Sequence, residues 1–222
     1  ILKEIKNFDS VKKVVSITSM VDDGGSSGIL RRKFNVLPPG DIRRHLLAFS
    51  DAENWKKELW EFRLGKHPFG NLFLSYLEVK YGFEKALEIA RKFLKIKRKY
   101  KVLPATMEKV KLFAKLENGK VLRGEHEIDI AKNRDGNLKI IDLWIKPLAN
   151  GYEKSIKEIK KTDLIIVGPG DLFSSLIPCF LPNGIKEACI NSKARKIFIC
   201  PAQRKYGETT NFFVEDFYNE FK

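Results

Sequence analysis

The sequence lacks the features that mark disulfide-stapled, zinc-binding and membrane-spanning proteins. Only three of its 222 residues are cysteine, and none forms a CxxC pair. An odd count without such pairs argues against a disulfide framework and against a zinc site. No apolar run reaches the roughly 18 residues of a membrane helix, and the start, ILKEIKNFDS, has no signal-like apolar segment. We therefore expect reduced thiols at Cys179, Cys189 and Cys200, in a cytoplasmic protein.

Recognisable catalytic and nucleic-acid-binding motifs are also missing. There is no HExxH metal motif and no GxxxxGK[ST] phosphate loop. No zinc finger or RNP-type aromatic motif is present. The sequence therefore leaves any catalytic residue unassigned.

Acidic residues are fewer than basic ones. The chain has 42 Lys and Arg against 28 Asp and Glu, which gives a formal net charge of +14. Such an excess allows nucleic-acid binding, but attraction of anionic small molecules is an equally physical explanation. Much of the charge is scattered, as in RKFLKIKRKYK at 91–101, where a solvated helix or strand face explains it as well. We therefore do not expect a nucleic-acid partner, because only the net charge favours one.

The hydrophobic pattern indicates a single α/β domain over 1–222. Hydrophobic residues make up 43% of the chain, including 16 Phe, which is enough for a substantial core. Nearly continuous apolar stretches, typical of strands buried in a parallel sheet, lie at 14–21, 163–170 and 195–200. Helical patterns lie at 1–8, 40–50, 54–64, 70–82, 83–96 and 151–162, with a helix start at 171–178 and an unfinished helix at the end. We expect Asp41 to be an N-cap and Gly82 to separate two helices.

The middle of the chain has a different pattern. Polarity alternates along 101–106, 109–129 and 133–147, and Asn118-Gly119 and Asp135-Gly136 are hairpin signals. The region 101–147 is therefore predicted as an antiparallel β-hairpin extension. Together the patterns predict an α/β sandwich with a mostly parallel sheet and this extension.

The first candidate site is the loop from Asp22 to Gly28, which follows the predicted strand 14–21. Open parallel sheets bind ligands at the carboxyl ends of their strands. Its glycines expose backbone N–H groups, its serines offer hydroxyls, and the following helix offers its positive end. The helix dipole contributes only about 0.3–1 kcal/mol, whereas each N–H bond to a phosphate contributes roughly 1.5–3 kcal/mol. The residues are Asp22, Asp23, Gly24, Gly25, Ser26, Ser27 and Gly28.

Two adjacent acids at an anion-binding loop need an explanation. Neighbours in extended chain point to opposite faces, so Asp22 and Asp23 need not form a pair. One could accept a hydrogen bond from a sugar or ribose hydroxyl, or hold Mg²⁺ against a phosphate. The other could cap the next turn, and a strand-to-helix turn with a capping aspartate explains the pair as well.

Three further loops carry candidate binding residues. In each, a plain turn, cap or hydrogen-bonded histidine is the alternative explanation. Arg43 could swing to a phosphate as a bidentate donor, and His67 could contact a phosphate or a base. The loops contribute Gly40, Asp41 and Arg43; His67, Gly70 and Asn71; and Gly168, Pro169, Gly170, Ser174 and Ser175.

Two of these loops share one pattern. Both follow a predicted buried strand and combine glycines and serines at a helix start, so we expect them at the same sheet edge. This repeated arrangement favours a phosphorylated, nucleotide-like ligand.

The four loops together resemble the YvcK-type gluconeogenesis factors, within the broader superfamily of CofD 2-phospho-L-lactate transferases. The matching stretches span roughly 14–217 in the family's order. They read VDDGGSSGILRRKFNVLPPGDIRR, HPFGNLFLSYL, VLPATMEKVKLFAKLENGKVLRGEHEI, LIIVGPGDLFSSLIPCFL and YGETTNF. The CofD relatives lack the Gly-Gly-Ser-Ser that follows the two acids, so the chain is more similar to the YvcK side.

The resemblance implies a Rossmann-like three-layer α/β fold and a cytoplasmic protein. It implies binding of UDP-sugars such as UDP-N-acetylglucosamine and a regulatory role in carbon metabolism, cell-wall synthesis and cell shape during gluconeogenic growth. Protein partners in cell-wall synthesis are implied too, and an oligomer is left open. The alternative is a CofD-like transferase that moves a phospholactyl-type group with Mg²⁺. In all four loops, the binding residues that the family resemblance implies are the candidate residues already named.

The chain departs from the family pattern at several places. Arg44 and His45 replace a small polar pair, the stretch before His67 is shorter, and AQRKYGET replaces a more neutral stretch around Gly207-Glu208-Thr209. Family members also begin with a strand and a glycine-rich phosphate loop before the first helix. The given sequence starts inside that helix and stops early, so we expect it to lack both terminal segments and to bind nucleotides poorly by itself.

Overall fold

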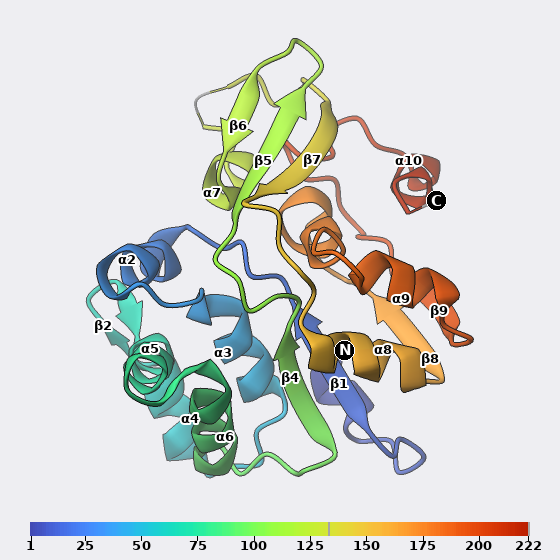
Figure 1. Cartoon of the computed structure of the whole chain (residues 1–222). Helices are drawn as coiled ribbons and strands as arrows, with labels where there is room; N and C mark the ends of the chain where they lie inside the picture. The colour runs from blue at the N-terminus through green and yellow to red at the C-terminus, as the bar shows by residue number, and fades with distance from the viewer. Residues whose placement is uncertain (133, 222) are drawn as a thin grey trace. The chain divides into compact units, whose positions relative to one another are not determined.

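The structure is a computed structural model that describes residues 1–132 and 134–221 (Figure 1). Residue contacts divide the chain into two compact units. The N-terminal unit contains residues 1–18 and 22–104, and the C-terminal unit contains residues 19–21 and those from 105 onward. Each unit combines helices with a parallel strand pair, which confirms the α/β class. Whether the units unfold together, as a single domain over 1–222 would, stays a prediction.

The N-terminal unit is built on two parallel strands. β1 (Val14–Thr18) pairs with β4 (Tyr100–Pro104), and its β-branched sequence VVSIT favours a strand. The predicted antiparallel pairing of 101–106 is therefore wrong, and the predicted strand 14–21 ends at Thr18. Side chains of β4 alternate between buried and less buried positions. Alternation reports that only one face is well covered, and it does not report the direction in which the strand pairs.

Helices and one short hairpin complete this unit. The helices are α1 (Leu2–Ile5), α2 (Gly25–Phe34), α3 (Pro39–Ala48), α4 (Asn54–Glu61), α5 (Phe69–Tyr81) and α6 (Phe83–Phe93). Gly82, at φ 81°, separates α5 from α6 as predicted. α4 is shorter than the predicted 54–64 because β2 (Arg63–Leu64) pairs with β3 (His67–Pro68) in an antiparallel hairpin.

The start of α3 differs from the prediction. Pro38 is the N-cap and Pro39 is the first helical residue, where its missing N–H costs nothing. The prediction that Asp41 is the N-cap is therefore wrong. Asp41 lies in the first turn, where its negative charge interacts favourably with the helix dipole.

Aromatic packing fixes the helices of this unit. Trp60 of α4 is fully buried, and its ring lies 5.8 Å from that of Phe73 and 6.0 Å from that of Phe93. Its indole Nε1 donates to the Arg43 carbonyl at 3.2 Å. Phe49 of α3 stacks on Tyr100 of β4 at 5.2 Å. These contacts hold α3, and with it Arg43, in place.

His45 ties α3 to β1 and makes this unit sensitive to acid. Its Nδ1 lies 2.6 Å from the Ser16 hydroxyl, and burial, followed by the charge of Arg44, lowers the pKa of His45 to about 4. The ordinary pKa of histidine is 6.5. Neutral His45 therefore stabilises the folded state fully above pH 6.5, and this stabilisation is lost as the pH falls towards 4. We expect the free energy of unfolding to drop by about 1–2 kcal/mol from this group between pH 7 and about pH 5. Urea unfolding at the two pH values should show a smaller drop in His45→Gln; an equal drop would contradict the assignment.

The C-terminal unit contains a three-stranded antiparallel sheet. Its strands, in the order β6-β5-β7, are β5 (Lys111–Leu116), β6 (Val121–Arg123) and β7 (Ile140–Lys146). Asn118-Gly119 turns the β5–β6 hairpin as predicted, with Gly119 at φ 86° and the Lys120 N–H bonded to Asn118 Oδ1 at 3.0 Å.

The second predicted hairpin does not form. A short helix, α7 (Glu125–Asp129), lies between β6 and β7, within a stretch predicted as strand. Asp135-Gly136 therefore lies in a turn that leads into β7, and β7 pairs with β5. Asn133, part of the stretch predicted at 133–147, lies outside the described residues.

The rest of this unit pairs two strands in parallel. β8 (Leu164–Val167) pairs in parallel with β9 (Arg195–Phe198). The connection between them contains two short helical turns, Leu172–Leu176 and Ile177–Cys179, and α9 (Ile185–Asn191). α8 (Glu153–Lys161) precedes β8, and α10 (Val214–Asn219) follows β9. The predicted full burial of both strands is wrong, because Leu164 and Ile197 are 43% and 41% exposed. An apolar run indicates a strand, but not how much of it other elements cover.

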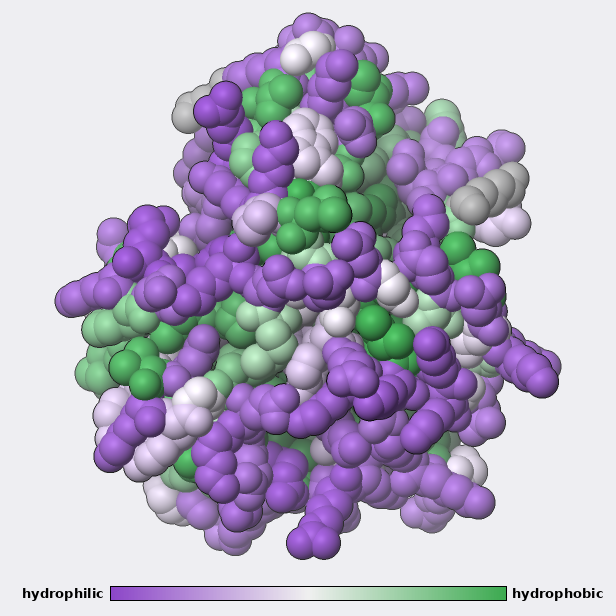
Figure 2. All heavy atoms as spheres, viewed as in Figure 1, coloured by the Kyte–Doolittle hydropathy of each residue, from purple (hydrophilic) through white to green (hydrophobic). Residues whose placement is uncertain are grey.

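The core of this unit lies under the antiparallel sheet. Leu112, Leu116 and Leu122 pack with Ile128 of α7 and Phe217 of α10. None of the three cysteines forms a disulfide. Among the described residues, no helix combines the length and apolar character needed to cross a bilayer. The face in Figure 2 is mostly hydrophilic, with smaller groups of hydrophobic atoms between the polar ones.

Candidate functional site

The loop after β1 leaves the start of α2 uncapped. α2 begins at Gly25, and its N-cap, Gly24, is extended and offers no side chain. The N–H groups of Gly25, Ser26 and Ser27 lie in the first turn, where a helix provides no acceptor of its own. The ten-residue helix adds its dipole at this end. The first turn of α2 is therefore open to an anion.

Asp22 holds this loop together. Its Oδ1 accepts from the Gly24 N–H at 3.1 Å, and its carboxylate also bonds the Ser27 side chain. Burial raises the pKa of Asp22, although the bonds to Ser27 and Gly24 oppose the rise. Arg31 of α2 donates to the Asp22 carbonyl at 2.8 Å. Of the roles weighed for the two acids, the geometry matches capping for Asp22.

The start of α3 lies directly on this loop. A Cβ at Gly40 would lie 2.6 Å from Asp22 Oδ2 and 2.7 Å from Ser27 Oγ. Only glycine leaves room for that approach.

Arg43 carries an unused donor. The side chain is buried, with the residue 8% exposed, and Nη1 pairs with Glu61. No partner for its Nε is found among the described residues. Burial, then the positive charges of Arg44 and Arg63, lower the pKa of Arg43 to about 10. Several guanidinium groups therefore repel one another at this place.

Asn71 carries an unused acceptor in a small polar network. The Ser26 hydroxyl lies 2.9 Å from His67 Nδ1 and accepts from Asn71 Nδ2 at 3.0 Å. Asn71 is 3% exposed, and its Oδ1 has no partner in the described part of the chain. A buried acceptor without a partner costs about 1–3 kcal/mol.

These groups meet in one pocket of the N-terminal unit, with a volume of about 530 Å³. That size is typical of small-molecule sites. The lining consists of Asp22, Gly24, Gly25, Ser26, Ser27, Gly40, Arg43, Arg44, Arg63, Gly65, Lys66, Pro68 and Asn71.

Five predicted residues of this unit are outside that lining. His67 bonds Ser26, and Asp41 pairs with Arg44 at 2.7 Å. Gly70 packs against Trp60, where a Cβ would lie 2.7 Å from the indole. Gly28 packs under the carbonyl of Asp23. All five support the pocket, and their contact with a ligand stays a prediction.

The sequence reasoning did not single out the residues of the β2–β3 hairpin. Arg63, Gly65 and Lys66 line the pocket, but 54–64 was predicted as one continuous helix. The available signal was Gly65, a glycine between Arg63 and Lys66 and two residues before His67; in the structure it lies at φ 60°.

The fourth predicted loop belongs to the C-terminal unit. Gly168 is at φ 96°, and a Cβ there would lie 2.7 Å from the Ile199 carbonyl oxygen. Ser174 donates its N–H and its hydroxyl to Glu208, at 3.1 and 2.7 Å. Since the loops at 22–28 and 168–175 lie in different units, their meeting at one sheet edge stays a prediction. Ligand contacts of Gly168, Pro169, Gly170, Ser174 and Ser175 also stay predictions.

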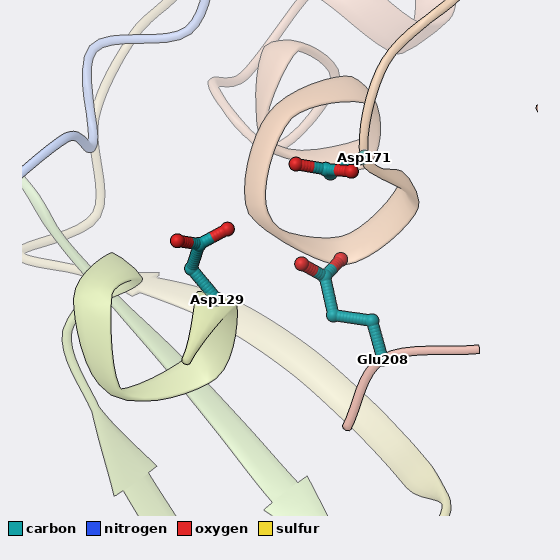
Figure 3. A group of neighbouring side chains, drawn as sticks. All are labelled: Asp129, Asp171 and Glu208. Carbon is teal, nitrogen blue, oxygen red and sulfur yellow. The ribbon is translucent and has the colours of Figure 1, made fainter. Parts of the chain in front are cut away.

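A charged cluster lies beside this fourth loop. Asp129, Asp171 and Glu208 come from three separate segments and point towards one another (Figure 3). The Lys205 ammonium bonds Asp129, Asp171 at 2.7 Å and Glu208 at 2.9 Å. Lys205 therefore neutralises part of the negative charge of the three carboxylates, as a bound metal ion would.

Neither acidic group fits a Mg²⁺ site. Mg²⁺ needs several free oxygen ligands in octahedral geometry. The pocket lining contains one carboxylate, that of Asp22, and it is bonded within its own loop. The three-carboxylate cluster is already paired with Lys205. We therefore assign no step to a metal.

Comparison with known proteins identifies the family. A model described as "2-phospho-L-lactate transferase CofD" matches residues 1–222. Proteins named "Putative gluconeogenesis factor" from Aquifex aeolicus and a Nostoc strain are 39% and 38% identical over 96% and 97% of the chain. The chain covers 66% and 47% of the length of these relatives. A "Gluconeogenesis factor" from Bacillus subtilis is 36% identical over 91% of the chain, which covers 64% of it.

A solved structure supports the same assignment. The crystal structure of a Bacillus halodurans protein, described as a member of the UPF0052 family, matches 98% of the chain. The match covers 70% of the Bacillus halodurans protein. The TM-score is 0.91 at 32% identity, which is consistent with the expected Rossmann-like fold. The chain belongs to the CofD-like family, among the YvcK-type gluconeogenesis factors.

Proposed function

We propose that the pocket at the start of α2 binds a nucleotide sugar such as UDP-N-acetylglucosamine. The observation that carries the proposal is a complementary pair of unused buried groups, Arg43 Nε and Asn71 Oδ1. Arg43 Nε needs an acceptor and Asn71 Oδ1 needs a donor. A ligand with both phosphate oxygens and free hydroxyls supplies the two together.

The surrounding groups favour the phosphate part of such a ligand. The open N–H groups of the first turn of α2 can bond its oxygens. A negative charge here also relieves the repulsion between Arg43 and Arg44. Because Asp22 is bonded within its loop, Asn71 Oδ1, and not an aspartate, accepts the hydrogen bond from a ligand hydroxyl.

In this proposal the protein is a regulator that senses the nucleotide sugar. The name of these relatives, gluconeogenesis factor, supports a link to carbon metabolism. The family resemblance adds a role in cell-wall synthesis and cell shape. Protein partners in cell-wall synthesis belong to this proposal.

Calorimetric titration of the chain with UDP-N-acetylglucosamine tests the proposal. We expect weak binding by the parent at millimolar ligand and a roughly tenfold to hundredfold loss in Asn71→Leu, which removes a hydrogen bond of about 1–3 kcal/mol. Asn54→Leu is the matched control, because Asn54 is exposed at the start of α4 and outside the pocket lining. Absence of binding at millimolar ligand, or equal affinity of the parent and Asn71→Leu, would contradict the proposal.

A CofD-like transferase is the second candidate. The match of the CofD family model to residues 1–222 supports it, and the bond between Ser26 Oγ and His67 Nδ1 provides a proton acceptor beside a hydroxyl. Incubation with a phospholactyl-type donor and a deazaflavin acceptor, with and without Mg²⁺, tests it. Transfer that disappears in His67→Gln would support it, and no product under any condition would exclude it.

A further inference from the structure

The β2–β3 hairpin brings two cations to the pocket that no other part of the proposal uses. Arg63 Nη1 donates to the Lys66 carbonyl at 3.3 Å, and the Phe69 N–H bonds the Phe62 carbonyl at 2.7 Å, which closes the hairpin at its base. Between the cations, Gly65 adopts φ 60° with nothing within 4 Å of its Cβ position. The turn brings both residues into the pocket lining.

These two cations differ from the other pair in the lining. Arg43 pairs with Glu61 and Arg44 pairs with Asp41. Within the described part of the chain, no carboxylate lies in ion-pair range of Arg63 or Lys66. Both are exposed, so they can rearrange around a ligand at little cost in packing.

The pocket also has room for more than one phosphate group. Its volume of about 530 Å³ reaches from the first turn of α2 to the hairpin, since Gly25, Ser26 and Lys66 all line it. A phosphate bound to the N–H groups of Gly25–Ser27 would leave the hairpin cations free to bind a second anionic group.

We propose that Arg63 and Lys66 form a second anion subsite that makes the pocket select a diphosphate over a monophosphate. The proposal rests on the proposed function, because it adds a second subsite to the same pocket. Arg63 offers a planar fork that matches two phosphate oxygens, and Lys66 adds a mobile point charge.

Titration of the chain with inorganic phosphate and with pyrophosphate, at low and equal ionic strength, tests the proposal. We expect the parent to bind pyrophosphate at least about tenfold more tightly, because one charge-assisted hydrogen bond to the second phosphate is enough for that ratio. Arg63→Met and Lys66→Met should each reduce the ratio without changing the phosphate affinity by more than about twofold. Lys12→Met is the control for the lost charge, because Lys12 is exposed and outside the pocket lining.

The outcomes separate this inference from the proposed function. A parent that binds both probes equally, or variants that keep the parent's preference, would overturn the diphosphate subsite alone. A parent that binds neither probe would overturn the anion pocket as well. A preference that falls equally in Lys12→Met would show that net charge, and not the hairpin, sets the ratio, which also overturns the inference.

Discussion

Gly28→Ala is expected to abolish ligand binding by the pocket and to destabilise the N-terminal unit by about 3 kcal/mol. A Cβ at Gly28 would overlap the carbonyl oxygen of Asp23 and lie 2.6 Å from its carbonyl carbon. The third neighbour, Arg32 Nη1 at 3.2 Å, ends a flexible side chain and can move away. The Asp23 carbonyl can move only with the loop from Asp22 to Gly25. The first turn of α2 would then lose the arrangement that the ligand needs.

Gly82→Ala is the matched control for this change. Gly82 lies at φ 81° and ψ 160° with nothing within 4 Å of its Cβ position, so alanine there costs about 1–3 kcal/mol of backbone strain. We expect normal binding in Gly82→Ala and none in Gly28→Ala, measured by titration on samples that denaturant unfolding shows to be folded. Parent-like affinity in Gly28→Ala would show that the loop tolerates a shift, and that the pocket does not depend on its present geometry.

Lys205→Met is expected to destabilise the C-terminal unit by about 3–5 kcal/mol at neutral pH, the usual effect of removing one partner of a buried ion pair. The Glu208 side chain is 0% exposed, and its acceptor oxygens hold the N–H groups of Phe173 and Ser174. Without the ammonium, this carboxylate stays buried near Asp129 and Asp171, with the charge of Arg134 as its remaining electrostatic partner. The loop that contains Ser174 would lose its anchor at the same time.

The pH dependence of that penalty identifies its cause. Burial raises the pKa of Glu208 above its ordinary 4.5, and Lys205 opposes the rise. Because this pKa is raised, protonated Glu208 stabilises the folded state below pH 4.5. The stabilisation is lost as the pH rises through the pKa of Glu208 in the folded state. Since Lys205→Met raises that pKa further, its penalty should shrink as the pH falls towards 4.5.

Two further variants separate charge from packing at Lys205. Lys205→Arg keeps the positive charge and should keep most of the stability, while the double variant Lys205→Met with Glu208→Gln should recover part of the loss at pH 7. Urea unfolding of each variant at pH 7 and near pH 4.5 makes the comparison. A penalty that is independent of pH would contradict the electrostatic explanation.

Local signals predicted the fold where a single residue decides the backbone. Gly82 separates two helices and Gly119 turns a hairpin because each of these two glycines adopts a positive φ. The direction of β4 was mispredicted, because alternation reports how well a strand is covered but not which way it pairs. The Asp135-Gly136 turn was misread as a hairpin because a helix, α7, occupies the expected strand before it.

The pocket was predicted in part for a similar reason. Gly25, Ser26 and Asn71 lie at helix starts with recognisable composition, and they line the pocket. Arg63 and Lys66 lie on a hairpin with two residues in each strand, which is too short to leave a periodic pattern in the sequence. The pairing of Lys205 with Asp129 joins segments 76 positions apart, and no local rule predicts such a contact.

A crystal structure of the chain with UDP-N-acetylglucosamine tests the central claim most directly. We predict phosphate oxygens at the N–H groups of Gly25–Ser27 and within hydrogen-bond distance of Arg43 Nε, with a ligand hydroxyl donating to Asn71 Oδ1. Ligand density elsewhere on the chain, with Arg43 Nε and Asn71 Oδ1 still unbonded, would contradict the account.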